Sequence, residues 1–278
     1  MNDLIENAAQ DLTASNYAIA LTGAGISTES GLPDFRGPSG LWTKRSGGER
    51  KPRLGFRDLL SDPVRWWIDR LSRPISLMGD LMTFQPNTGH LALAELERMD
   101  VLKCVITQNI DGLHTKAGSK HVLEYHGNSL KLRCIECEAR YDRNEYDLEG
   151  LQSDGRLPPK CKKCGGLIKT DGVGFGEPIP EYVASASMKE AMKCDLMLIC
   201  GTSAVVYPFA NLPRIAINKH VYSADDTFDY DTPLSVTVIE VNAEPTPLTE
   251  DGTSDYIIEG KIGEILPAIA ERVKELKG

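Results

Sequence analysis

The sequence lacks any apolar run approaching the roughly 20 residues that a helix needs to cross a bilayer. Its opening residues, MNDLIENAAQ, place acids before any base and contain no apolar centre, so we expect no secretory signal peptide. It also lacks a positive charge balance, because 31 Lys and Arg stand against 40 Asp and Glu, a net charge of −9. Broad nucleic-acid binding needs a basic face, so we expect a cytoplasmic protein with no direct nucleic-acid or membrane partner.

What the sequence does contain is an ordinary globular composition. Hydrophobic residues make up 41% and charged residues 26% of the 278 positions, which is enough to bury one large core or two modest ones. The acidic balance fits a basic peptide substrate, and it also fits solubility alone, which requires no partner.

Strand-like apolar runs alternate with helical patterns along most of the chain. The strand-like runs are Tyr17–Leu21, Lys103–Asn109, Asp195–Ser203, Val236–Asn242 and Asp255–Lys261. Helical spacing starts at Asn2–Ser15 and recurs up to the closing segment GEILPAIAERVKELK. Wholly apolar strands that alternate with helices predict an α/β fold, a Rossmann-like parallel sheet with helices on both faces. Such sheets bind ligands at the carboxyl ends of their strands, where this chain places polar residues.

Two stretches interrupt the alternation. Residues 44–84 are first basic and then aromatic, with several prolines, and we interpret them as a helical insertion with loops. Residues 129–170 hold two cysteine pairs and many charges, and they predict a small zinc-binding module. The α/β domain is then expected to comprise residues 1–43, 85–128 and 171–278.

The cysteines are unevenly distributed. Cys134-x-x-Cys137 and Cys161-x-x-Cys164 each form a turn that offers two thiolates to one ion. Chance and disulfides are the alternatives, and the missing secretory signal favours metal. Four thiolates leave no open coordination position, so this Zn²⁺ is expected to be structural and not to activate water. The remaining three lie in apolar runs and are expected to be small buried side chains: Cys104, Cys194 and Cys200.

The stretch LTGAGISTESGLPDFRG, Leu21–Gly37, follows an apolar strand as a dinucleotide-binding turn does. Gly23 and Gly25 allow the backbone to turn closely beneath a phosphate. The third glycine of the dehydrogenase fingerprint is missing, because Thr28 stands in its place, and no clear ribose-binding acid follows at the usual spacing. The turn therefore argues against a hydride-transfer enzyme.

A series of motifs resembles those of sirtuins, NAD-dependent protein-lysine deacylases, and occurs in the same order. After the glycine turn with its PDFRG tail come TQNIDGLH (Thr107–His114), EYHGN (Glu124–Asn128), the cysteine quartet, VGFGE (Val173–Glu177), GTSAVVYPFANLP (Gly201–Pro213) and VIEVNAEPTPL (Val238–Leu248). Each motif is weak alone, and their combination is specific.

The resemblance implies that NAD is the co-substrate. In the family the PDFR segment is the mobile cofactor loop, so Phe35 is expected to cover the nicotinamide pocket and Arg36 to hold the loop. Asn109 and Asp111 are expected to hold nicotinamide in a cleavable pose, although such a pair after a strand is by itself typical of a turn. The expected NAD-binding residues are Gly23, Ala24, Gly25, Ser27, Asp34, Phe35, Arg36, Gln108, Asn109, Asp111, Gly201, Thr202, Ser203, Asn242, Glu244 and Ile262.

His126 matches the family's catalytic His-Gly pair. A lone histidine is more often structural, but an imidazole with a reference pKa of about 6.5 suits a base near neutral pH. The expected catalytic residues are therefore His126, Asn109 and Asp111. His90 and His114 also lie in sirtuin-like motifs and are interpreted as structural.

The acylated-lysine peptide is expected to add a strand between two extended segments, Phe175–Glu177 and Val206–Pro208. By resemblance, the carbonyl of Val173 holds the amide of the acylated lysine. The expected substrate-binding residues are Val173, Phe175, Gly176, Glu177 and Val206. The family usually has bulkier residues than Gly172 and Gly174 here, so the lysine tunnel would be wider or looser.

The acyl preference stays open at this point. Sirtuins that remove acidic acyl groups carry a Tyr-x-x-Arg pair, for which the nearest match is Trp67 and Arg70, and Trp67 has no hydroxyl. The favoured function is removal of acetyl groups from protein lysines, giving nicotinamide, O-acetyl-ADP-ribose and free lysine. The alternatives are a deacylase for longer or acidic groups, a mono-ADP-ribosyltransferase, and a module that binds NAD without turnover.

Overall fold

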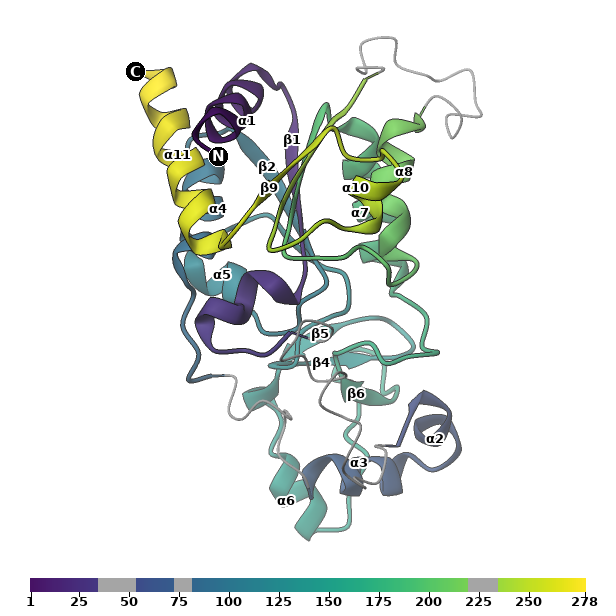
Figure 1. Ribbon diagram of the computed structural model, residues 1–278. Helices are drawn as coiled ribbons and strands as arrows, with labels where there is room; N and C mark the ends of the chain where they lie inside the picture. The colour runs from purple at the N-terminus through teal and green to yellow at the C-terminus, as the bar shows by residue number, and fades with distance from the viewer. Residues whose placement is uncertain (35–53, 73–81, 220–234) are drawn as a thin grey trace, which may run out of the picture.

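The computed structural model describes residues 1–34, 54–72, 82–219 and 235–278 (Figure 1). Phe35 and Arg36, both expected at the cofactor, lie outside the described residues, as do parts of the expected helical insertion. Among the helices of the described ranges, none has both the length and the apolar character needed to cross a membrane.

Six parallel strands form the central sheet. In spatial order they are β3 (Val122–Glu124), β2 (Leu102–Thr107), β1 (Ala18–Thr22), β7 (Leu196–Cys200), β8 (Thr237–Asn242) and β9 (Tyr256–Glu259). Leu21 in β1 pairs with Ile106 on one side and with Ile199 on the other. The chain order reverses between β1 and β7, and in open parallel sheets this is where a crevice for ligands forms, at the carboxyl ends of the strands. The predicted Rossmann-like sheet is confirmed.

Helices cover both faces of the sheet (Figure 1). One face carries α1 (Asn2–Ala14), α4 (Thr88–Arg98) and α11 (Ile262–Lys277), and the other carries α7 (Glu181–Lys193), α8 (Leu212–Ile217) and α10 (Pro247–Glu250). The strands are apolar at nearly every position because alternate side chains enter two different cores. Leu198, for example, points to the α1 side, and its neighbour Met197 to the α7 side.

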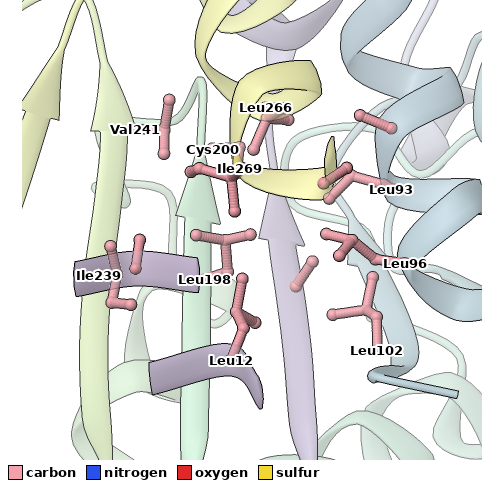
Figure 2. Packing of buried hydrophobic residues seen from close by; sticks show 14 of the residues in the cluster. Leu12, Leu93, Leu96, Leu102, Leu198, Cys200, Ile239, Val241, Leu266 and Ile269 are labelled. Atoms are coloured by element: carbon pink, nitrogen blue, oxygen red, sulfur yellow. The ribbon is translucent and has the colours of Figure 1, made fainter. Parts of the chain in front are cut away.

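The larger core lies between the sheet and the helices α1, α4 and α11. Figure 2 shows Leu12 of α1, Leu93 of α4 and Ile269 of α11 over Leu198 and Ile239 of the sheet. All five are buried, so this layer excludes water behind the strands whose ends form the crevice. The three cysteines outside the paired motifs are buried, as expected. Cys200 lies in this core, and Cys104 and Cys194 lie in the core on the opposite face of the sheet.

A second, antiparallel sheet lies beyond the carboxyl ends of the large one (Figure 1). It contains β5 (Arg140–Asp142), β4 (Lys131–Cys134) and β6 (Ile168–Thr170), in that order, and α6 (Leu148–Ser153) belongs to the same module.

The helices α2 (Phe56–Ser61) and α3 (Pro63–Leu71) pack on this module, with Leu59, Trp66 and Trp67 in its core. The indole Nε1 of Trp67 donates to the carbonyl of Ile168 at 2.9 Å. The described part of the insertion and the cysteine module therefore share one core, which their separation in the sequence does not reveal.

Candidate active site

The glycine turn after β1 packs directly against the loop after β7. The amide of Gly25 donates to the carbonyl of Gly201 at 2.8 Å. A Cβ at Gly23 would lie 2.6 Å from Cβ of Thr202, and a Cβ at Gly25 would lie 2.7 Å from Cα of Gly201. These glycines are required by contact between the two loops, in addition to any contact with a phosphate. The short helix η1 (Ala24–Ser30) begins at this point, so Ala24 is the first residue of that helix.

A chain of hydrogen bonds joins this turn to the segment after β2. The side-chain amide of Asn109 donates to the carbonyl of Gly23 at 3.1 Å and to the hydroxyl of Ser27 at 3.0 Å. Ser27 in turn donates to Asp111 at 2.8 Å. Both N–H groups of Asn109 are thus used within the protein, which leaves its Oδ1 to accept from a ligand. Burial raises the pKa of Asp111, and hydrogen bonds from the Leu113 amide and from Ser27 oppose that rise.

His126 lies just beyond β3 and beside two aromatic rings that also contact each other. Its ring centroid is 5.6 Å from that of Tyr125 and 6.4 Å from that of Phe209. Its Nδ1 is 3.2 Å from the carbonyl oxygen of Gln108, and a carbonyl can only accept. The neutral ring therefore carries its proton on Nδ1 and keeps the lone pair on Nε2. Burial lowers the pKa of His126, partly offset by this hydrogen bond, so the ring is a neutral base at neutral pH.

Further polar contacts connect the ends of β2, β7 and β8. The amide of Gln108 donates to Oγ1 of Thr202 at 2.6 Å, and the amide of Asn242 donates to the carbonyl of Thr202 at 3.3 Å. A Cβ on Gly201 would lie 2.8 Å from Ile262, so the start of α11 lies against the same loop. The expected cofactor residues after four strands are therefore neighbours. Of the others, Asp34 and Ser203 are half-buried, whereas Glu244 is exposed beyond β8.

Glu240 is a buried anchor that the sequence reading did not include. It lies inside β8, and its carboxylate accepts from Thr246 and Thr249 at 2.5 Å each and from Ser254 at 2.7 Å. The amide of Asn242 also lies 3.4 Å from it. Glu240 thus holds the loop that follows Asn242. The sequence signal is a charged residue inside an otherwise apolar strand, because a buried carboxylate needs donors.

The segment Phe175–Glu177, expected to be extended, belongs to a turn. The amide of Glu177 donates to the carbonyl of Gly174 at 3.1 Å, and Gly176 has φ of +78°. The carboxylate of Glu177 fixes this turn, since it accepts from the Gly174 amide at 3.0 Å and from Nζ of Lys169 at 2.7 Å. The expected extended conformation is therefore wrong here. The side chain of Phe175 is 81% exposed at the tip.

The second expected clamp segment, Val206–Pro208, is also not a strand. It leads into the short helix η4 (Phe209–Asn211), and the amide of Ala210 donates to the carbonyl of Val206 at 3.0 Å. The amide of Val173 donates to the carbonyl of His126 at 2.8 Å. Val173 therefore contacts the backbone of His126. Both segments that were expected to clamp the peptide are turns in the structure.

The four paired cysteines converge. Their Sγ atoms all lie within 4.8 Å of one another, with 3.5 Å between Cys134 and Cys164 and 3.6 Å between Cys137 and Cys161. Thiolates at about 2.3 Å from a tetrahedral Zn²⁺ stand about 3.8 Å apart, so these residues fit one ion. Cys134 and Cys161 are buried in the same core as Trp66 and Trp67, so a metal ion bound by these cysteines would stabilise that core.

Two buried histidines lie behind the crevice. The rings of His90 and His114 are 4.9 Å apart, and Nε2 of His114 is 2.8 Å from the hydroxyl of Thr22. Burial lowers the pKa of His90 to about 4. Burial, and next the nearby His90, lower the pKa of His114 well below its usual value. Both rings are neutral in the folded chain, as a structural role requires.

These histidines predict a loss of stability in mild acid. In the unfolded chain His90 takes up a proton near pH 6.5, whereas in the folded chain it does so only near pH 4. The free energy of unfolding is therefore highest above pH 6.5 and decreases as the pH falls towards 4. The loss from His90 alone is about 3 kcal/mol. Denaturant titrations across this pH range should show a flatter dependence in His90→Gln. The exposed His121 gives the control variant His121→Gln, which should keep the wild-type slope; equal slopes in all three proteins would contradict the prediction.

Comparison with known proteins gives consistent matches. The model of the Sir2 family matches residues 23–208. An NAD-dependent protein deacylase 2 of Archaeoglobus fulgidus is 42% identical over 278 residues, covering 100% of this chain and 99% of the relative. A solved Sir2 homologue in complex with NAD has a TM-score of 0.71 at 35% identity, covering 98% of this chain and 95% of that one. A Sir2 protein bound to a myristoylated histone peptide has a TM-score of 0.64 at 36% identity, covering 100% and 99%.

Proposed function

This chain belongs to the Sir2 family and is an NAD-dependent protein deacylase, and on that premise we propose that His126 is the general base of its reaction. The observation that carries the assignment is the hydrogen bond from Nδ1 of His126 to the carbonyl of Gln108. It fixes the tautomer whose Nε2 can take a proton, and burial keeps that nitrogen unprotonated at neutral pH.

We assign Asn109 and Asp111 to the nicotinamide end of the NAD pocket. Their support is the bonded chain through Ser27, which holds both side chains rigidly at the switch point of the sheet. In the proposed reaction the acyl oxygen of the substrate lysine displaces nicotinamide from the ribose. This first step requires orientation and no protein nucleophile. A ribose hydroxyl then attacks the acyl carbon, and that step requires the base.

The adenosine end of NAD is assigned to the loops after β7 and β8. Thr202, Asn242 and Ile262 are supported by their mutual contacts around Gly201, and Ser203 and Glu244 by their neighbouring positions in the chain. The Zn²⁺ on the four cysteines is structural, since its four thiolates leave no position for a substrate.

Acylated-lysine proteins or peptides are the substrates, and the finer assignments around them are proposals. We place the peptide beside Val173, with the turn at Gly174–Glu177 and the segment at Val206 opening to admit it. We retain residues 1–43, 85–128 and 171–278 as the NAD-binding domain. The net charge of −9 supports the absence of a nucleic-acid partner, and four metal-binding thiols support a reducing, cytoplasmic location.

We expect deacetylation to exceed desuccinylation in kcat/KM. Trp67 is fully buried against Ile168, and Arg70 donates to the carbonyl of Leu54 at 2.9 Å while stacking over Trp66 at 4.4 Å. Both side chains therefore serve the packing of the module, and neither is presented to an acidic acyl group. Steady-state kinetics on matched acetyl and succinyl peptides test this. A higher kcat/KM for the succinyl peptide would mean that another cationic side chain binds the succinyl carboxylate.

The function itself is tested by following nicotinamide release with and without acetylated peptide, with mass spectrometry of the NAD products. We expect release that depends on the peptide, together with O-acetyl-ADP-ribose and free lysine. Release that instead attaches ADP-ribose to protein would identify a mono-ADP-ribosyltransferase, and binding of NAD without release would identify a module without turnover. Adding propionyl and myristoyl peptides extends the assay to the longer groups that a wider tunnel around Gly172 and Gly174 would admit.

A further inference from the structure

A network of six charged side chains lies between the central sheet and the zinc module, and the reaction described above gives a role only to Glu177, in the turn beside the peptide. Three carboxylates balance three cations. Five of the six side chains are at most 9% exposed, the exception being Arg140 at 26%. The members are Glu124, Arg133, Arg140, Lys169, Asp171 and Glu177.

Arg140 joins the two halves of this network. It lies on β5 of the zinc module, and its Nη2 is 2.6 Å from the carboxylate of Glu124 and 2.6 Å from that of Asp171. Glu124 is the last residue of β3 in the central sheet. Asp171 follows β6, where the chain leaves the module. One guanidinium therefore ties the sheet to the returning chain.

The two carboxylates both accept hydrogen bonds from Asn128, two residues after His126. Glu124 precedes His126 by two residues and accepts from the side chain of Asn128, which follows His126 by two. The carboxylate of Asp171 accepts from the backbone amide of Asn128 at 2.8 Å. Between them Gly127 touches the same segment, because a Cβ there would lie 2.2 Å from the carbonyl oxygen of Asp171. The backbone on each side of His126 is thus fixed by groups that Arg140 holds together.

Stability alone is a poor account of such a network. Buried ion pairs lose in desolvation about what they gain in attraction, so replacing them by apolar residues is often neutral or stabilising. Buried ion pairs do fix the relative positions of the groups that they join. The position of a general base matters for its rate, since a displacement of about 1 Å can cost about 10²-fold.

We propose that Arg140 is a positioning residue for His126, so that the zinc module sets the geometry of the base through one guanidinium. The inference rests on the proposed role of His126. Loss of Arg140 should slow the second step, in which the base acts. It should leave the first step unchanged, because that step requires only the NAD pocket around Asn109.

The test compares Arg140→Met and Arg140→Lys with Arg156→Met, a control that removes the exposed Arg156–Asp154 pair of the same module. We expect Arg140→Met to lower the kcat of deacetylation by about 10- to 10²-fold at saturating NAD and peptide, with both KM values within about twofold. Nicotinamide exchange and zinc content should stay close to those of the control when assayed well below the melting temperature, which should fall in Arg140→Met because two buried carboxylates lose their cation. Arg140→Lys should recover part of the loss, since an ammonium keeps the positive charge but sits on a shorter side chain than the Nη2 that contacts both carboxylates.

Two outcomes would overturn the proposal. One is a kcat of Arg140→Met equal to that of the control. The other is a parallel loss of exchange, deacetylation and zinc in both Arg140 variants, which would assign Arg140 to folding only. If His126→Ala deacetylates at the wild-type rate, the proposed base is wrong, and that result is independent of any Arg140 variant.

Discussion

His126→Ala is expected to lower the kcat of deacetylation by about 10²- to 10⁴-fold, the usual contribution of a general base. The fold and the zinc content should be unchanged, because the ring is half-buried at the edge of the crevice and contributes one hydrogen bond. Nicotinamide exchange that depends on the peptide should persist, since the first step requires no base. Steady-state deacetylation and exchange measured on the same preparation check both statements.

The matched variant is Asn109→Ala, which removes an orienting group of the first step. It should lose exchange and deacetylation together. In the wild type, kcat/KM should rise with pH to a plateau, with a midpoint below 6.5, because burial lowers the pKa of His126 and only the neutral ring is active. A near wild-type rate in His126→Ala, or a midpoint well above 6.5, would show that the base lies elsewhere.

Removal of the metal is expected to unfold the zinc module and with it the insertion helices. The four cysteines are placed to bind one ion at the edge of a small core, and metal-binding energy in such modules, on the order of 10 kcal/mol, is folding energy. Trp66 and Trp67 report on this core because both are buried in it. A strong chelator, or Cys134→Ser, should shift their fluorescence to the red and abolish deacetylation.

Cys104→Ser is the control for this experiment. Cys104 is buried in the central sheet and is not part of the cysteine cluster, so the variant should retain one Zn²⁺ per chain and the native fluorescence. Metal analysis that finds no zinc in purified, active wild-type protein would contradict the prediction.

The central sheet was predictable from sequence because each of its long strands is apolar at nearly every position, a pattern that only double coverage by helices explains. Its polar strand ends also identified the crevice, including Gln108, Asn109 and Asn242. The cysteine spacing specified the metal ligands in the same local way. These features depend on residues that are close together in the chain.

The missed features depend on residues that are distant in the chain. Arg140 meets Glu124 and Asp171 only after the zinc module has folded back, and no local pattern pairs them. The turn at Gly174–Glu177 was missed for a similar reason, because Lys169 fixes it through a side-chain contact that overrides the extended motif.

The points where the chain enters and leaves the zinc module lie side by side. The amide of Val173 meets the carbonyl of His126 at 2.8 Å, and the amide of Asp171 meets that of Lys131 at 3.0 Å. A segment whose two ends are already joined adds little closure entropy, whatever its length. The module is therefore a closed excursion from the α/β domain, and any domain that replaced it would have to cover Leu59, Trp66 and Trp67 and supply a cation between Glu124 and Asp171.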